Sequence, residues 1–125
     1  MKINWLMIFL GGGLGSLCRY YTTIFFDKRF SEIMPIGTFV SNMLACGILG
    51  LAAGYLMKHD INDSLSLFLL VGFCGGFSTF STFSKENFYL LENSHFLQLA
   101  LNIILSVSIG ILVLFAGMKL GKNIN

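Results

Sequence analysis

The residues best suited to chemistry form one motif, GFCGGFSTFSTFS, at positions 72–84. Phenylalanine recurs at every third position from Phe77 to Phe83, with two hydroxyl side chains in each gap. An aromatic ring has a negative face and a positive edge, so an anion can pass ring edges while hydroxyl and amide donors complete its shell. A stripe of phenylalanines is also typical of ordinary core packing, and the motif alone leaves both interpretations open.

Two adjacent glycines, Gly75 and Gly76, interrupt the apolar segment that contains this motif. Each glycine inside a helix costs about 1 kcal/mol relative to alanine. Unwinding the helix there would free backbone carbonyls, which in lipid must find a partner in protein, water or an ion. Broken helices of other transport proteins present carbonyls to a cation and amides to an anion. The glycines therefore predict either a break near the bilayer centre or close helix packing.

Polar side chains inside other apolar segments are functional candidates by default. Thr38, Asn42 and Cys46 lie four residues apart and so share one helix face. Asn102 and Ser106 have the same spacing later in the chain. Serine and threonine can bond their own helix carbonyls, but an asparagine amide has four hydrogen-bonding positions that a helix backbone cannot all serve. The two asparagines are therefore the stronger candidates.

The apolar segments offer hydrogen-bond donors and no carboxylate. Arg19, slightly past the middle of the first segment, would cost about 2.5–3.5 kcal/mol at the bilayer centre, so we expect it to snorkel or to face water. A proton-coupled drug exporter of the small four-helix type needs an intramembrane carboxylate, and the apolar blocks contain no Asp or Glu. Hydroxyls, amides and one guanidinium favour an anion as the substrate.

Four long apolar blocks must position these side chains. The chain has 125 residues, of which 55% are hydrophobic and 11% charged, whereas a soluble domain has about 25% charged residues. Each block has the roughly 20 residues that a helix needs to cross about 30 Å of hydrocarbon. We predict an all-α membrane protein with a single domain over residues 1–125. Its helices are expected at about residues 4–26, 33–57, 64–92 with a break near 75–78, and 96–119.

The basic residues leave the orientation in the membrane nearly undecided. One side would hold Lys2, Lys58, Lys119 and Lys122. The other would hold Lys28, Arg29 and Lys85. Such a balance predicts dual topology with antiparallel pairing, although a weak bias can also resolve to one orientation. Glycine pairs four residues apart allow close packing within or between chains: Gly11/Gly15, Gly50/Gly54, Gly72/Gly76 and Gly117/Gly121.

Three ordered motifs resemble the CrcB/Fluc family of fluoride channels: GGGLG…RY over 11–20, GTF…N…C…G over 37–50, and the motif at 72–84. The resemblance covers essentially the full chain. It implies a passive channel, not an enzyme, that exports fluoride across the cell membrane of a microbe, which we expect to be a bacterium. It also implies an antiparallel homodimer in the lipid bilayer, with two pores, a central structural sodium ion and no nucleic-acid partner.

The resemblance further implies roles for individual residues. Phe80 and Phe83 are similar to the paired pore phenylalanines, and Asn42 to the pore asparagine of the second helix. The main-chain carbonyls of Gly75 and Ser78, from both subunits, are expected to hold the sodium. Further polar residues complete the predicted fluoride pathway: Ser81, Thr82, Thr38, Ser106 and Arg19.

The chain departs from the family pattern at several positions. Phe77 stands where leucine is expected, and Ser78 replaces a more usual threonine, which does not affect a backbone ligand. In the fourth helix Asn102 occupies a position often held by tyrosine, and Gly110 lacks an expected hydroxyl. The polar track of that helix is therefore left open.

Two other functions compete with the channel. A small dual-topology multidrug exporter would need a proton gradient and the carboxylate that the apolar blocks lack. A membrane structural or assembly subunit would use the phenylalanine and glycine stripes for packing alone and would transport nothing.

Overall fold

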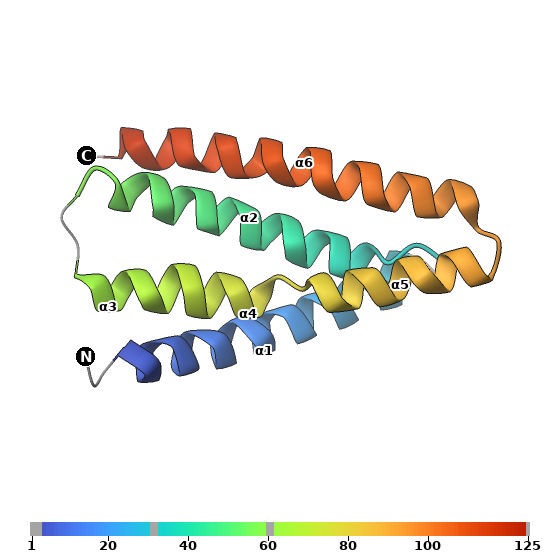
Figure 1. The fold of residues 1–125 in the computed structure, drawn as a ribbon, viewed down its shortest axis with the longest axis horizontal. Coiled ribbons are helices and arrows are strands. Elements are labelled where there is room, and N and C mark those ends of the chain that lie inside the picture. Colours follow the sequence, from blue (N-terminus) through green and yellow to red (C-terminus); the bar gives the residue numbers. More distant parts are fainter. Residues whose placement is uncertain (1–3, 31–32, 60–61, 125) are drawn as a thin grey trace.

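The computed structural model describes residues 4–30, 33–59 and 62–124, and these residues form helices and short connections without a strand. The helices are α1 (Asn4–Phe30), α2 (Ile36–Leu56), α3 (Asp63–Ser66), the π-helix η1 (Leu67–Cys74), α4 (Gly75–Phe77), α5 (Phe80–Glu92) and α6 (Phe96–Asn123). Figure 1 shows α3 to α4 as one rod that α5 continues after an interruption. The predicted all-α fold is confirmed.

Among the described residues, three segments are long and apolar enough to cross a membrane: Ile36–Leu56, Asp63–Glu92 and Phe96–Asn123. The protein is therefore a multi-pass membrane protein. The first helix, α1, has 27 residues, or about 40 Å of helix, but glycines, tyrosines and Arg19 make it less apolar than the other three. In Figure 1, α1 runs beside the other helices, and the two chain ends lie at the same end of the bundle.

The helix ends differ from the predicted ones. Both α1 and α6 continue four residues beyond the predicted ends at 26 and 119. Charged residues occupy these extensions, including Lys28 and Arg29 at the end of α1 and Lys122 at the end of α6. Hydropathy marks the part of a helix in hydrocarbon, whereas backbone hydrogen bonding continues into the headgroup region.

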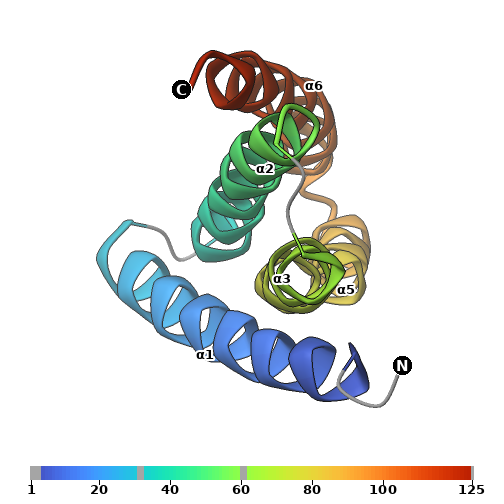
Figure 2. The same cartoon turned by 90° about the vertical axis from the view of Figure 1, so that its left-hand side faces the viewer.

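Glycines allow the backbones of α6 and α2 to contact each other directly. A Cβ added at Gly50 would overlap the carbonyl oxygen of Leu114, and one added at Gly117 would lie 2.8 Å from the carbonyl oxygen of Gly47. Neither contact leaves room for a side chain. In Figure 2, α6 lies against α2, on the side of the bundle away from α1.

A second glycine contact joins α1 to the rod of η1 and α4. A Cβ at Gly15 would overlap the carbonyl oxygen of Phe73, and one at Gly76 would overlap that of Gly12. The sequence left open whether glycines pack helices within or between chains. In the structure they pack helices within the chain, in two pairs that are not neighbours in sequence.

Adding one methyl group at Gly15 is expected to destabilise the protein, because the α1 backbone must then move away from Phe73. We expect Gly15→Ala to lower the free energy of unfolding by about 1–3 kcal/mol. Gly13→Ala is the matched control on the same helix, since nothing lies within 4 Å of its added Cβ. It should leave stability unchanged or raise it by up to about 1 kcal/mol through helix propensity. Unfolding in mixed detergent micelles measures both, and equal losses would contradict the packing assignment.

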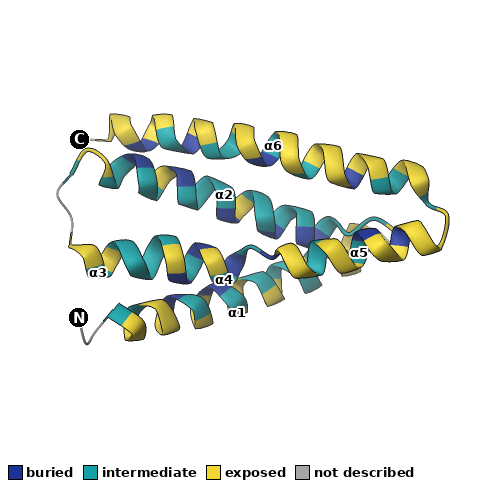
Figure 3. Cartoon of the chain, viewed as in Figure 1, coloured by how far each residue is buried: buried dark blue, intermediate teal, exposed yellow. Residues whose placement is uncertain are grey.

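Most of the apolar surface is uncovered in the single chain. In the apolar 18-residue stretch of α6, only 11% of the residues are buried. In the corresponding stretch of α2, 28% of the residues are buried. Figure 3 shows the outer side of α6 as almost wholly exposed along its length. An apolar surface of this extent requires lipid, or lipid together with a second chain, to cover it.

The π-helix η1 occupies eight residues of the third span and is followed by α4, after which the span is interrupted. Such helices are rare and occur mostly as single turns within α-helices, frequently at functional sites. Gly72 of η1 contacts α1, since a Cβ there would lie 2.8 Å from the carbonyl oxygen of Ile8. Gly72 thus brings the backbone of η1 into close contact with that of α1.

Candidate functional site

The third span leaves helical geometry at Ser78 and Thr79, two residues after the glycine pair. Their backbone angles are extended, with φ −80° and ψ 158° at Ser78 and φ −151° and ψ 117° at Thr79. Gly75 to Phe77 remain helical as α4. We predicted a break near 75–78, with the glycines as its cause. Gly76 instead packs against Gly12, and the chain opens at the first polar residues that follow.

The backbone of the break is bonded to a side chain of α2. Thr79 donates its amide hydrogen to Asn42 Oδ1 at 2.8 Å, and Asn42 Nδ2 donates to the Thr79 carbonyl at 3.4 Å. Thr79 Oγ1 in turn accepts from the amide of Thr82 at 3.2 Å and caps the start of α5. Asn42 therefore bonds both the amide and the carbonyl of Thr79, a residue that lies outside the helices on either side of it.

The break also changes the bonding of two carbonyls that we predicted as sodium ligands. The Thr79 amide is the ordinary helical partner of the Gly75 carbonyl, but it donates to Asn42 instead. Gly75 is exposed, and its added Cβ would meet nothing within 4 Å. The Ser78 carbonyl accepts from Arg19 Nη1 at 3.3 Å and keeps a second lone pair.

A groove of about 260 Å³ beside the break gathers part of the predicted fluoride pathway. Asn42, Phe80, Phe83 and Ser106 line it, together with Thr79. The rings of Phe80 and Phe83 lie 6.1 Å apart between centroids, and Phe80 is 80% exposed in the single chain. The groove is therefore open on the side where Phe80 lies.

The predicted stripe of three phenylalanines is wrong at its first member. Phe77 belongs to α4, before the break, and is 5% exposed. It packs against Phe73 at 5.7 Å between ring centroids. The extended residues 78 and 79 end the helical periodicity that would have aligned Phe77 with Phe80.

Three of the other four predicted pathway residues lie around a second, larger groove of about 790 Å³ among α1, α2 and α5. Arg19, Thr38 and Thr82 line it, and Thr79 borders both grooves. Ser81 lines neither groove. Its hydroxyl oxygen lies 3.4 Å from Thr79 Oγ1, within hydrogen-bonding distance. The break thus stands between two grooves, and most of the candidate residues divide between them.

Glu86 lies beyond the uncharged stretch that ends at Ser84 but inside the third span, which was predicted at 64–92 and is observed at Asp63–Glu92. Thr38 Oγ1 donates to Glu86 Oε1 at 2.6 Å, while Glu86 Oε2 is buried with no partner in the described residues. The helical spacing of four from Thr82 was the signal that could have placed Glu86 on the face toward α2.

Asn102, which we singled out as a strong candidate, is used to join α5 to α6. It is buried, and its Nδ2 donates to Asn87 Oδ1 at 2.9 Å. Ser106 Oγ donates to Asn102 Oδ1 at 3.5 Å. On α6, therefore, Ser106 lines the groove beside the break. Asn102, one turn earlier, accepts the hydroxyl hydrogen of Ser106.

Comparison with known proteins decides the family. The family model described as "CrcB-like protein, Camphor Resistance (CrcB)" matches residues 6–118. The chain belongs to the CrcB family. This confirms the resemblance that the three sequence motifs indicated.

Within the CrcB family the chain is similar to several proteins named "Fluoride-specific ion channel FluC". That of Flavobacterium psychrophilum is 42% identical over 118 residues, which cover 94% of this chain and 95% of the relative. That of Gloeothece citriformis is 40% identical and covers 94% and 96%. That of the archaeon Pyrococcus abyssi is 38% identical and covers 94% and 95%.

Proposed function

We propose that this protein is a passive fluoride channel that exports fluoride from the cytoplasm through the cell membrane. Relatives of nearly equal length bear the name of fluoride-specific ion channels, and the CrcB family is one of ion channels and not of enzymes. The observation that carries the proposal is the groove in which Asn42, Phe80 and Phe83 meet at the break. Hydrogen fluoride enters cells uncharged, dissociates inside, and leaves as the ion down its electrochemical gradient.

The chemistry of this groove suits a small, strongly hydrated anion. The Asn42 amide has two N–H groups, and one of them is engaged by the Thr79 carbonyl. The amide oxygen of Asn42 accepts the Thr79 amide hydrogen. The second N–H of Asn42 is therefore the group that this side chain offers to a ligand. Phe80 and Phe83 supply positive ring edges. These groups replace water molecules that the ion must shed, while Ser106, whose hydroxyl donates to Asn102 Oδ1, forms part of the groove wall.

We further propose that α1 is a fourth span and that two chains pair antiparallel to form two pores. The exposure of Phe80 supports pairing, since the groove in one chain lacks a wall that a second chain would supply. The nearly even distribution of basic residues supports both orientations. A reporter fused to the carboxyl terminus should be found on both sides of the membrane. A reporter found on one side alone would contradict dual topology.

We propose that a sodium ion holds the two breaks of such a dimer together. The Gly75 carbonyl, released from its helical partner, and the Ser78 carbonyl fit this task, with two oxygens from each chain. A bound sodium supplies a fixed positive charge and is not transported. Exchanging sodium for a large organic cation during purification should lower the temperature at which the dimer dissociates. Dissociation at the same temperature in both salts would contradict the site.

Fluoride efflux from proteoliposomes tests the function itself. We expect efflux driven by the fluoride gradient alone, with chloride retained in the same vesicles. A multidrug exporter, whose required carboxylate Glu86 could supply, would need a proton gradient. A structural subunit would pass neither ion. Equal leakage of chloride and fluoride, or no fluoride efflux, would overturn the proposal.

A further inference from the structure

The last turns of α1 carry two cations and two aromatic rings on one face. Lys28 and Arg29 are exposed, and Tyr21 and Phe25 are 67% and 54% exposed. Together with Ile24 they line an open groove of about 540 Å³. The guanidinium of Arg29 lies over the ring of Phe25, 5.7 Å from its centroid. Ile24 also borders the larger groove beside the break, but none of the five is among the predicted fluoride-pathway residues.

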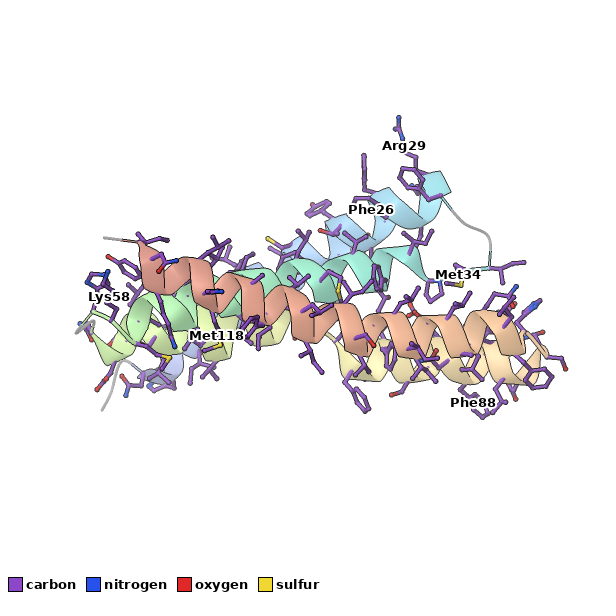
Figure 4. The ribbon with its side chains drawn as sticks, turned by 90° about the horizontal axis from the view of Figure 1, so that it is seen from above. Phe26, Arg29, Met34, Lys58, Phe88 and Met118 are labelled. Carbon is purple, nitrogen blue, oxygen red and sulfur yellow. The ribbon has the colours of Figure 1, made fainter. Side chains whose placement is uncertain are left out.

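This face points away from the rest of the chain. Thr23 and Asp27, on the other side of the same turns, bond to α2, where Ser41 and the amide of Gly37 are their partners. Figure 4 shows the carboxyl-terminal part of α1 projecting away from the other helices, with Arg29 directed outward at its tip. The end view in Figure 2 agrees. The groove therefore faces the surroundings of the protein.

The charge on this face is positive because the neighbouring acid is engaged elsewhere. Asp27 Oδ1 accepts the Gly37 amide hydrogen at 2.8 Å, at the start of α2, so it is turned away from Lys28 and Arg29. Two adjacent cations beside exposed aromatic rings are typical of the level of the lipid headgroups. A guanidinium binds a phosphate group with two parallel hydrogen bonds.

An apolar path leads from this groove toward the bilayer centre. Leu10, Leu14 and Leu17 repeat at spacings of four and three, which continue to Tyr21 and Ile24 and keep all five on one helix face. The three leucines are exposed, by 46%, 50% and 55%. A lipid whose headgroup sits at Lys28 and Arg29 can therefore lay its acyl chain along α1.

We infer that the face formed by Tyr21, Ile24, Phe25, Lys28 and Arg29 is a binding site for an anionic phospholipid. Its phosphate would be held by Arg29 and Lys28, and its acyl chain would lie on the leucines of α1. A zwitterionic lipid brings a positive group that these two cations repel. The site therefore selects phosphatidylglycerol over phosphatidylcholine. The inference rests on the proposed fourth span, but not on the transported ion.

Quenching of a single tryptophan by brominated lipids tests the site in the full-length protein. Trp5→Phe removes the only native tryptophan, and Tyr21→Trp places a reporter in the groove. In vesicles with equal amounts of the two lipids, brominated phosphatidylglycerol should quench more than brominated phosphatidylcholine. About 1 kcal/mol for each of two cations corresponds to a relative binding constant of about 30. If Tyr21→Trp does not fold, Phe25→Trp provides a second reporter.

Charge removal separates this site from general attraction to the membrane. Lys28→Gln with Arg29→Gln should bring the relative binding constant close to one. Lys119→Gln with Lys122→Gln removes two exposed cations from α6 and should leave the preference intact. A preference that survives the first pair, or that is absent from the parent, overturns the inference. Loss of the preference in excess inorganic phosphate would assign the groove to free phosphate. No quenching by either lipid would remove α1 from the bilayer and would reject the fourth span as well.

Discussion

Replacing Phe80 and Phe83 together by isoleucine is expected to reduce fluoride efflux about 100-fold while the protein keeps its size and helix content. Isoleucine is apolar but has no ring edge to face an anion. We assume that each ring edge stabilises the ion by about 1–2 kcal/mol in a site without water. This is the size of the stabilisation that a ring face gives to a cation. Two rings then supply about 3 kcal/mol, and each 1.36 kcal/mol is a factor of ten in rate. Fluoride-selective electrodes outside proteoliposomes measure the efflux.

Phe115→Ile is the matched control for this experiment. Phe115 lies on α6 and is 63% exposed, but it does not line the groove at the break. Efflux should remain at the level of the parent protein. Unchanged efflux in the double variant at Phe80 and Phe83, with equal amounts of reconstituted protein, would show that the rings do not line the pathway.

Asn42→Leu is expected to damage both the stability of the protein and its flux. Leucine removes the side-chain partners of the Thr79 amide and carbonyl, and water is scarce at this depth of a membrane. Each buried backbone group left without a partner costs about 1–3 kcal/mol. We therefore expect the free energy of unfolding to fall by about 2–6 kcal/mol. Flux should be lost even in the folded fraction.

Two further variants resolve the roles of Asn42. Asn42→Asp keeps the acceptor for the Thr79 amide and removes the donor, so its stability should lie between those of the parent and the leucine variant. Asn93→Leu makes the same chemical change at an exposed residue whose Nδ2 bonds the Tyr89 carbonyl in its own helix. It should cost little. Equal losses for Asn42→Leu and Asn93→Leu would contradict the role of Asn42 at the break.

The fold could be predicted from the sequence because lipid imposes a simple rule. In hydrocarbon every backbone group must be bonded within the segment, so long apolar blocks must be helices. The positions of the helix ends were less accurate, since charged residues such as Lys28 and Lys122 continue the helices past the apolar blocks. The first helix remains a proposed span, because Arg19 and its glycines weaken the hydropathy on which the rule depends.

The position of the break could not be fixed from the sequence alone. Gly75 and Gly76 have the propensity to end a helix, but Gly76 is needed against Gly12 of another helix. The break begins instead where Asn42 is within reach of the Thr79 backbone. Such partners come from residues about forty positions apart in sequence, and no local pattern reveals them. Glu86 was missed for a different reason, because its spacing of four from Thr82, which indicates the face toward Thr38 of α2, was not used.

The two glycine contacts connect α1 with the third segment and α2 with the fourth, so that each helix skips its neighbour in sequence. A ribosome therefore releases Gly15 about sixty residues before its contact surface on η1 and α4 exists, a delay of about 3–12 s at typical elongation rates. During this time the glycine face of α1 has no partner from the third segment. Translation pauses or membrane chaperones that act between these two moments should consequently affect the yield of correctly assembled protein, whereas the contact of α2 with α6 forms only after the last segment has emerged.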